Sequence, residues 1–427
     1  MKGSFNRRHS RWYERLIFSE FFYLIAGLVV ATVPPALMRW GTAWYQLIQT
    51  EEVHFNTFLA CGFAFFGVFL ILRRFKSYPG AHTLSYILPS VAISYLLVFA
   101  VLFMTREGYA RSVLLGSFAL TNLWCFAGFY ISRRFRTPKL ALVPFGRTLG
   151  LTAGDEATLD LLVAPDLEGR RYDAVVADLH SDDLPPVWER FLARCVLSRI
   201  PVYNIRQVQE SLTGRVRVNH LSENEFGALL PSPVYDFFKR FMDITLVVMT
   251  LPVWLPVILI TGVIIKLESQ GPMFFIQERI GQGSRAFRVY KLRSMCQDSE
   301  KDGAQFAAAN DMRVTQVGRV IRKTRIDELP QFINVLKGEM SLIGPRPEQK
   351  TFVERFEKEI PFYTYRHVVK PGITGWAQVV HGYAANADDT RVKIEHDFYY
   401  IKHFSLWLDI LIIFRTIRTI LTGFGAR

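Results

Sequence analysis

Residues 323–331 read Lys-Thr-Arg-Ile-Asp-Glu-Leu-Pro-Gln, and residues 336–348 read Leu-Lys-Gly-Glu-Met-Ser-Leu-Ile-Gly-Pro-Arg-Pro-Glu. Two adjacent carboxylates, Asp327 and Glu328, therefore stand among basic residues, namely Arg319, Arg322, Lys323, Arg325, Lys337 and Arg346. Cations lower the pKa of a nearby carboxylate and keep it ionised, and they also attract phosphate. An ionised carboxylate beside phosphate-binding groups suits phosphoryl transfer, in which it is a nucleophile or a magnesium ligand.

A solvent-exposed helix with ion pairs at i,i+3 and i,i+4 spacing would also explain the carboxylate pair. Two further features favour a site. The run Gly344-Pro-Arg-Pro347 predicts a rigid turn that presents one guanidinium. The segment also follows hydrophobic stretches that look like membrane elements.

The composition indicates a membrane protein with a basic surface. Of the 427 residues, 50% are hydrophobic, and the mean hydropathy is +0.16, which is too apolar for an ordinary soluble enzyme. The length predicts two or three domains. The formal net charge of +13 suits anionic lipid headgroups or phosphorylated substrates. Nucleic acid is not expected as a partner, because the basic residues flank apolar stretches and no nucleic-acid motif occurs.

Four apolar segments are long enough to cross a bilayer, which needs about 20 residues; they are roughly 17–38, 53–72, 82–104 and 112–132. We expect Pro34 and Pro35 to mark the outer end of the first. Basic residues cluster before the first span and after the second and fourth, whereas the other two loops hold few. The loop charges therefore predict that both ends of this region, and everything after residue 133, face the cytoplasm.

The stretch 139–230 alternates strand-like and helix-like pieces. Strands are expected at 140–145, 172–177 and 201–203, with a helix at 186–199, a pattern that predicts a small parallel sheet. Gly146 and Gly150 follow the first strand, but their spacing does not match the Gly-x-Gly-x-x-Gly dinucleotide fingerprint. A folded spacer or oligomerisation module is the favoured interpretation, with nucleotide binding as the alternative.

A fifth apolar segment, 241–265, carries Pro252 and Pro256 near its middle and basic residues at both ends. These features predict a re-entrant helix that breaks near Pro252 and returns to the cytoplasmic side; the alternative is a kinked full span. The last helix, 404–422, is apolar on one face. It suits the membrane interface, or equally the enzyme's own core.

Three further runs accompany the opening stretch. They are Gly271-Pro-Met-Phe-Phe-Ile-Gln-Glu-Arg-Ile-Gly281, Tyr290-Lys-Leu-Arg-Ser-Met295 and Val369-Lys-Pro-Gly-Ile-Thr-Gly-Trp-Ala-Gln378. Together these motifs resemble the signature of the bacterial sugar transferase family, the monotopic phosphoglycosyl transferases, over roughly 234–427. The resemblance to the long multi-pass members implies an α/β membrane protein. It would comprise a four-helix transmembrane bundle (1–135), a cytoplasmic β/α Rossmann-like module (136–232) and a mainly helical catalytic domain (233–427) with the re-entrant helix 241–265.

The resemblance also implies an activity. Such an enzyme transfers sugar-1-phosphate from a UDP-sugar to undecaprenyl phosphate, releases UMP and starts an exopolysaccharide, capsule or O-antigen (lipopolysaccharide) at the bacterial inner membrane. Asp327 would be the nucleophile that forms a phosphosugar intermediate, and Glu328 would ligate Mg²⁺ or assist the acceptor. The bilayer is an expected partner, a homodimer is a candidate assembly, and the sugar is not specified.

The basic residues divide by expected role. Arg346 can present its guanidinium fork to the donor's diphosphate or uridine. Arg279, Lys291 and Arg293 match basic positions of the family motifs and are expected to bind substrate phosphates, with surface charge or an ion pair as the alternative for each. Glu348 is expected either to bind the donor or to cap a helix. Lys370 lies in a turn expected to approach the site. Arg325 departs from the family pattern, in which a small residue is common.

Other patterns are expected to be structural. Gly281-Gln-Gly283 predicts a hairpin turn, since it lacks the ending of a phosphate-binding loop. Cysteines and histidines show no metal-ligand spacing, so any metal should be a hard, oxygen-ligated ion. Two other functions are less favoured. The intact motifs disfavour an assembly protein with an inactive enzyme domain, and the lack of a charge in the middle of the four spans disfavours a transporter.

Overall fold

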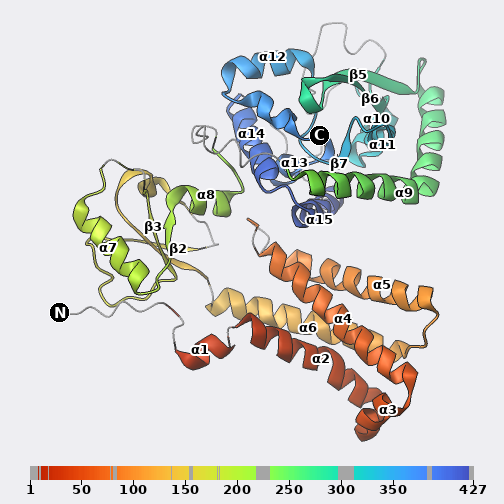
Figure 1. Ribbon diagram of the computed structural model, residues 1–427. Helices are drawn as coiled ribbons and strands as arrows, with labels where there is room; N and C mark the ends of the chain where they lie inside the picture. Colours follow the sequence, from red (N-terminus) through yellow and green to blue (C-terminus); the bar gives the residue numbers. More distant parts are fainter. Residues whose placement is uncertain are drawn as a thin grey trace. The chain divides into compact units, whose positions relative to one another are not determined.

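Long apolar segments in the first part of the chain form the helices that their hydropathy predicts (Figure 1). In the computed structural model these are α2 (Glu20–Trp40), α4 (Glu52–Phe75), α5 (Ile87–Thr105) and α6 (Arg111–Phe135). Shorter helices flank them, namely α1 (Trp12–Ile17), η1 (Gly41–Ala43), α3 (Trp44–Thr50) and η2 (Leu84–Tyr86). The structure describes residues 8, 11–17, 19–76, 78–79, 84–135, 137–152, 157–179, 181, 183–217, 231–296, 312–381 and 387–422.

The chain divides into two compact units, Met1–Gly214 and Arg215–Arg427. The expected boundary at residue 135 falls inside the first unit, so the division into three regions stays a prediction. The expected module's last stretch, 218–230, lies outside the described residues.

The four long helices of the first unit pack against one another, with α2 against α4 and α6, and α5 against α4 and α6. The expectation that Pro34 and Pro35 end the first span is wrong, because both lie inside α2. Pro35 cannot donate to the Ala31 carbonyl four residues earlier. Ser117 Oγ of α6 donates to that carbonyl instead, at 2.5 Å. A neighbouring helix thus satisfies the backbone group that the proline leaves free, as membrane helices allow.

The first unit also holds a four-stranded parallel sheet in the order β2-β1-β3-β4. Its strands are β1 (Lys139–Leu142), β2 (Thr158–Leu161), β3 (Ala174–Ala177) and β4 (Val202–Asn204), with helices α7 (Pro186–Leu197) and α8 (Ile205–Thr213); the 3-10 turn η3 (Gly146–Gly150) follows β1. The predicted parallel sheet is confirmed, although β2 was not foreseen.

Alternation along the strands explains how both faces of this sheet are covered. Ala141 and Val175 point into a core with Phe191 of α7. Their neighbours Leu140 and Val176 belong to the other core, with Ile205 and Val208 of α8. Strands buried on both faces read as continuous apolar runs, which made β1 and β3 recognisable. The half-exposed edge strand β2 gave no such signal.

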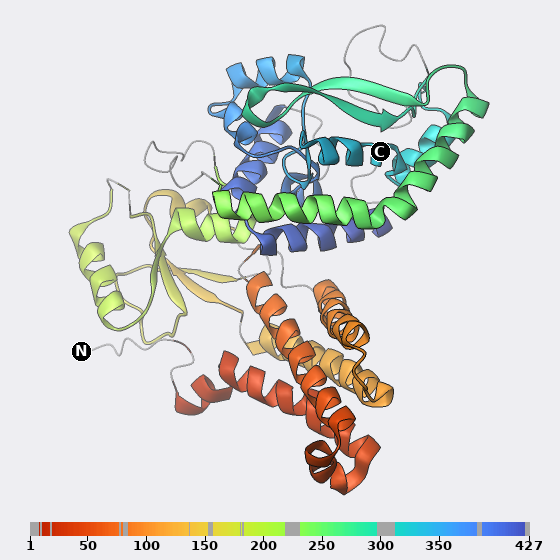
Figure 2. The ribbon, with the colours of Figure 1, turned by 45° about the vertical axis from the view of Figure 1, so that its right-hand side comes forward.

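The second unit begins with α9 (Pro233–Glu268), a single helix that bends sharply along its length (Figures 1 and 2). The expected break at Pro252 is thus a bend within one helix that contains both Pro252 and Pro256. Pro252 cannot serve the carbonyl of Val248. The carbonyl of Val247, the residue before Val248, accepts a hydrogen bond from the indole of Trp254 at 2.9 Å. Prolines inside a helix are a usual cause of such a bend, and α9 contains two.

A hairpin follows α9, and short helices surround it. Strands β5 (Phe274–Ile280) and β6 (Ala286–Leu292) pair antiparallel around η6 (Gln282–Ser284), which confirms the predicted turn. The remaining elements are α10 (Gln316–Lys323), η7 (Ile326–Glu328), α11 (Gln331–Lys337), β7 (Ser341–Ile343), α12 (Lys350–Glu359), η8 (Tyr363–Val368), β8 (Gly372–Thr374), α13 (Trp376–Val380), α14 (Ala387–Lys402) and α15 (Leu406–Thr422). Strands β7 and β8 pair in parallel.

Helix α9 has one packed face and one bare apolar face. Val247, Trp254, Ile258 and Ile265 pack against residues of β6, α10 and α11. On the other side, large side chains are exposed, among them Phe237, Phe238, Phe241, Met249, Val253 and Leu267. A contiguous apolar surface of this size is typical of membrane contact. Within the described residues, five helical segments are long and apolar enough to cross a membrane: Glu20–Thr50, Glu52–Phe75, Leu84–Thr105, Arg111–Phe135 and Pro233–Glu268.

Candidate active site

The adjacent carboxylates lie on a tight turn between two helices. Helix α10 ends at Lys323, and Arg325 adopts the left-handed region, with φ of 59°. The chain then makes the 3-10 turn Ile326–Glu328, and Pro330 directly precedes α11, which begins at Gln331. A solvated helix is therefore the wrong interpretation of this sequence: the Glu328 residue is only 6% exposed.

Glu328 is surrounded by three cations from three parts of the second unit. Its Oε1 lies 2.8 Å from Arg346 Nη2 and 3.3 Å from Lys291 Nζ. Its Oε2 lies 3.6 Å from Arg325 Nη1. Burial opposes its ionisation, but Arg346, Lys291 and Arg325 together hold the pKa of Glu328 far below its usual range. Glu328 is consequently a permanent anion that fixes the surrounding cations.

Asp327 has the opposite character. Its Oδ1 is buried and accepts no hydrogen bond from the described residues. Burial raises the pKa of Asp327 to about 6, and the charge of Glu328 adds to the increase, against the pull of Lys291, Arg346 and Arg322. The pair thus titrates at two separated positions, with Glu328 low and Asp327 high. An unpartnered buried oxygen of this kind is available to react or to bind a ligand.

Arg346 stands on a turn that is anchored through its carbonyl groups. Pro345 and Pro347 supply no N–H, yet the carbonyls of residues 345–348 each accept one hydrogen bond. In the order of these four carbonyls, from 345 to 348, the donors are Gly372 N (2.9 Å), Arg366 Nη2 (2.8 Å), Arg279 Nη1 (3.2 Å) and Ile280 N (3.0 Å). Gly344 and Gly372 allow this, because a Cβ on Gly372 would lie 2.0 Å from Gly344 N.

Glu348 and Arg279 support this turn. Glu348 binds Lys393 Nζ at 3.0 Å and lies 3.6 Å from Arg279 Nη1. Burial opposes its ionisation, but these cations and Arg366 lower the pKa of Glu348 to about 2. Glu348 does not cap α12, which begins at Lys350 after Gln349.

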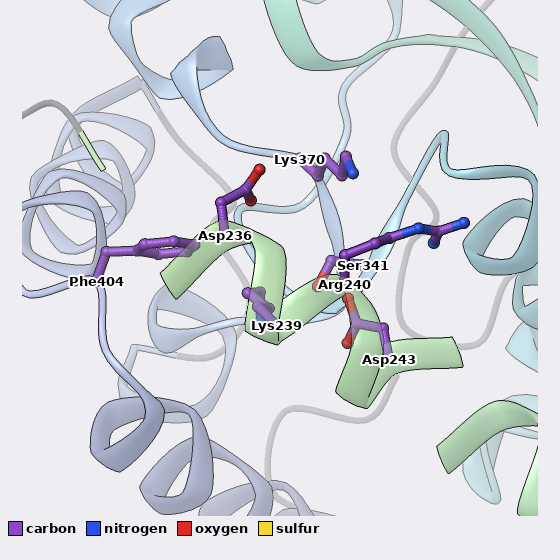
Figure 3. A pocket seen from close by; sticks show the side chains of 7 residues that line it. All are labelled: Asp236, Lys239, Arg240, Asp243, Ser341, Lys370 and Phe404. Atoms are coloured by element: carbon purple, nitrogen blue, oxygen red, sulfur yellow. The ribbon is translucent and has the colours of Figure 1, made fainter. Parts of the chain in front are cut away.

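Two of the expected substrate-binding residues, Arg293 and Lys370, have their described contacts with parts of the chain other than the carboxylates. The Arg293 guanidinium donates to the carbonyls of Ser269 and Gln270, both at 2.7 Å, and so closes the C-terminal end of α9. Lys370 lines a small pocket with Lys239, Arg240 and Asp243 of α9 (Figure 3); Asp236, Ser341 and Phe404 complete its lining. The motif residues thus divide among three places: the carboxylate cluster (Asp327, Glu328 and the cations Lys291, Arg325 and Arg346), the C-terminal end of α9 near Arg293, and the N-terminal part of α9 near Lys370.

The structure adds residues that the sequence did not reveal. Asp397 of α14 pairs with Arg366 at 2.8 Å, and Asp409 of α15 pairs with Lys239 of α9 at 2.5 Å. Asp397 directly precedes the apolar run Phe398–Ile401, whose residues are at most 2% exposed. An acidic residue that borders such a run was the available signal for Asp397, but its partner Arg366 lies 31 positions away. The partner of Asp409, Lys239, lies 170 positions away.

The site offers one suitable carboxylate ligand for a hard metal ion, rather than a complete set of protein ligands, among the described residues. Among the described residues, no group of three or more His, Cys, Asp or Glu side chains could hold a metal. The unpartnered Oδ1 of Asp327 is a suitable ligand, and Mg²⁺ commonly takes one or two carboxylates together with substrate phosphates. The oxygens of Glu328 are already taken by cations, so Asp327 is the better of the two expected ligands.

The loop after β1 carries no open phosphate cradle. Gly146 has a φ of 64°, and the following Arg147 N–H donates to Asp178 Oδ2 at 3.2 Å. A carboxylate of the chain itself therefore occupies the place beside this loop where a nucleotide phosphate would bind. This arrangement favours the spacer interpretation of the β/α module.

Comparisons with known proteins identify the family of this chain. The family model described as bacterial sugar transferase matches residues 234–423. A protein of Aeromonas hydrophila is 58% identical, over 99% of this chain and 100% of its own length. The chain belongs to the bacterial sugar transferase family. The Aeromonas relative is named UDP-N-acetylgalactosamine-undecaprenyl-phosphate N-acetylgalactosaminephosphotransferase.

Other members of the bacterial sugar transferase family match only part of the chain. UDP-glucose:undecaprenyl-phosphate glucose-1-phosphate transferases of Caulobacter vibrioides and Escherichia coli are 41% and 40% identical. Each alignment covers 46% of this chain, and they cover 74% and 45% of those proteins, respectively. The family match includes α9 and every residue of the carboxylate cluster. The protein is therefore a transferase whose candidate active site lies wholly in the family-defining part.

Proposed function

We propose that the protein transfers N-acetylgalactosamine-1-phosphate from UDP-N-acetylgalactosamine to undecaprenyl phosphate and so begins a bacterial surface polysaccharide. The near full-length match with the Aeromonas relative supports the substrates. The observation that carries the mechanism is the contrast between Asp327, with its unpartnered oxygen, and the cation-bound Glu328. Only one of the two carboxylates is available to attack.

Asp327 is the nucleophile in this proposal. A carboxylate oxygen attacks the sugar-bearing phosphorus of the donor, and the bond from that phosphorus to the bridging oxygen breaks. UMP leaves with the bridging oxygen, and an acyl-phosphate joins Asp327 to the sugar phosphate. An oxygen of undecaprenyl phosphate then attacks the same phosphorus and expels the carboxylate. The product is the sugar linked to undecaprenyl diphosphate, and Asp327 is regenerated.

The cations around Glu328 neutralise the phosphates during both steps. Arg346 and Lys291 are each held by Glu328 Oε1, so their positions are set before substrate binds. Lys291 lies on β6 and Arg346 on the anchored turn. Glu328 thus acts by fixing cations rather than by taking a proton.

Asp327 Oδ1, together with the donor's phosphates, would hold Mg²⁺. When bound, the ion supplies neutralisation of the charge on the diphosphate. All other roles fall to side chains already present, since Arg346 and Lys291 orient the donor. Asp327 must be ionised to react. Its pKa is raised only to about 6, so the carboxylate is mostly ionised at neutral pH.

In this proposal the bent α9 holds the candidate active site at a membrane surface. Its bare apolar face would enter the bilayer and return to the cytoplasmic side, as its basic ends favour. The acceptor's lipid tail would then lie in the bilayer, with its phosphate at the surface. The loop charges support a site on the cytoplasmic side of the inner membrane, where nucleotide sugars are made.

Two measurements on the purified full chain test the proposal. UMP release should require undecaprenyl phosphate for multiple turnovers and should be fastest with UDP-N-acetylgalactosamine among UDP-sugars. UDP-glucose is the second candidate donor, since relatives matching the catalytic part are named for it. With donor alone, mass spectrometry should find a sugar-phosphate adduct on the peptide containing Asp327. An adduct elsewhere, or turnover by Asp327→Asn, would overturn the mechanism.

A further inference from the structure

Arg366 is a buried arginine next to the candidate active site, and it binds the backbone of Arg346. The Arg366 residue is 3% exposed. Its Nη2 donates to two acceptors at 2.8 Å each, the Arg346 carbonyl and Asp397 Oδ2. Its Nη1 donates to the Tyr363 hydroxyl at 2.9 Å. These contacts join η8, α14 and the turn that carries Arg346.

The hydrogen-bond pattern of Arg366 favours a positioning role over simple stabilisation. Its Nε is buried and has no hydrogen-bond partner among the described residues. A buried cation is costly unless its donors are paired. Arg366 nevertheless leaves one donor unpaired while Nη2 serves both Asp397 and the Arg346 carbonyl. Asp397, only 1% exposed, supplies the counter-charge that permits a buried guanidinium here.

We propose that Arg366, held by Asp397, is a positioning residue that sets the direction of the Arg346 guanidinium toward the donor's diphosphate. This inference rests on the proposed function, in which Arg346 binds the donor. The Arg346 backbone is flanked by prolines that cannot donate hydrogen bonds, so its carbonyl is a principal point by which the turn can be held. Movement of that carbonyl moves the guanidinium that Glu328 binds from the other side.

Lysine cannot replace arginine in this position. An ammonium is a point charge without a planar fork, and it cannot reach the three acceptors that Arg366 joins. Arg366→Lys therefore keeps the charge beside Asp397 but releases the turn. Asp397→Asn keeps the shape of the acid and leaves Arg366 without its counter-charge. Both changes should act on Arg346 without touching substrate.

UDP binding to the full-length protein in lipid nanodiscs, with Mg²⁺ present, provides the first test. UDP carries the diphosphate whichever sugar is used. Arg366→Lys and Asp397→Asn should weaken UDP binding and raise the donor KM about tenfold, as expected for a misplaced binding group. The KM for undecaprenyl phosphate should not change.

Asp409→Asn is the matched control. Asp409 is also a buried acid of the second unit, 2% exposed, but it pairs with Lys239 rather than with Arg366. It should lower the melting temperature as much as Asp397→Asn does and leave UDP affinity unchanged. Equal loss of UDP affinity in both variants would mean that Asp397 has a structural role only.

A double-mutant cycle separates this inference from the proposed function. If Arg366 acts through Arg346, then Arg346→Ala with Arg366→Lys should bind UDP no worse than Arg346→Ala alone. Unchanged binding in Arg346→Ala would refute the donor-binding role itself. Weakening by Arg346→Ala with additive effects would refute only the positioning role. If Arg366→Lys and Asp397→Asn do not fold, Tyr363→Phe can replace them, because it removes one acceptor of Arg366 and changes no charge. Unchanged UDP affinity in Tyr363→Phe would then overturn the inference.

Discussion

Glu328→Gln should move the acid side of the pH–activity profile to lower pH. Glu328 contributes to the raised pKa of Asp327, which stands at about 6. For a generic separation of about 7 Å between charges on neighbouring side chains, and an effective dielectric of about 20, the repulsion is roughly 2.4 kcal/mol, or about 1.7 pKa units. The amide removes this repulsion while Arg346, Lys291 and Arg325 remain positively charged. The pKa of Asp327 should therefore fall by about 1.7 units in Glu328→Gln.

The assay is UMP release between about pH 5 and pH 8, analysed as kcat/KM. The unmodified protein should lose activity as pH falls through about 6, because protonated Asp327 cannot attack. Glu328→Gln should be slower at every pH, since three cations lose their anchor, yet its profile should be flat down to about pH 5. Glu328→Asp keeps the charge and is the control, with lower activity and an unmoved acid side. An acid side that stays near pH 6 in Glu328→Gln would refute this account of the pair.

Three other changes test separate parts of the structure. Asp327→Asn should abolish turnover and raise the melting temperature at pH 7. The folded protein holds the Asp327 proton up to about pH 6, so ionisation destabilises the fold above that pH, by at most about 3 kcal/mol; a lower melting temperature contradicts this. EDTA should remove activity and Mg²⁺ restore it, and full activity after chelation would exclude the metal. Single cysteines at positions 237 and 268, without the native cysteines, should both be labelled only from the cytoplasmic face. External labelling at 268 would make α9 a true span, and Pro252→Ala should favour that outcome.

Hydropathy and motif order predicted the helices and strands well, but they did not predict which side chains contact one another. The four apolar helices and the parallel sheet follow from periodicity and length, which depend on local sequence. Pro35 was misjudged because the donor that satisfies Ala31 comes from α6, far along the chain. Motif membership likewise did not tell where a side chain points. Lys291 reaches Glu328, whereas Arg293, two residues later, binds the end of α9.

The candidate site shows the same division. Asp327, Glu328 and Arg346 were recognisable because they lie in motifs that resemble the family signature. The sequence did not reveal that Asp327 and Glu328 differ in their partners. Which carboxylate is available depends on which oxygens the cations reach in the folded protein. Arg366 and Asp397 were missed because their pairing exists only after η8 packs on α14.

The buried pair of Lys239 and Asp409 has a consequence for synthesis of the protein. The two residues are 170 positions apart, and translation adds roughly 5–20 residues per second. Lys239 is therefore synthesised some 10–30 s, at these approximate rates, before its partner exists. During that interval its charge is unpaired at the basic end of an apolar helix, where a cation resists translocation. The last helix then neutralises it, so the same lysine can first direct how α9 meets the membrane and later become part of the enzyme's core.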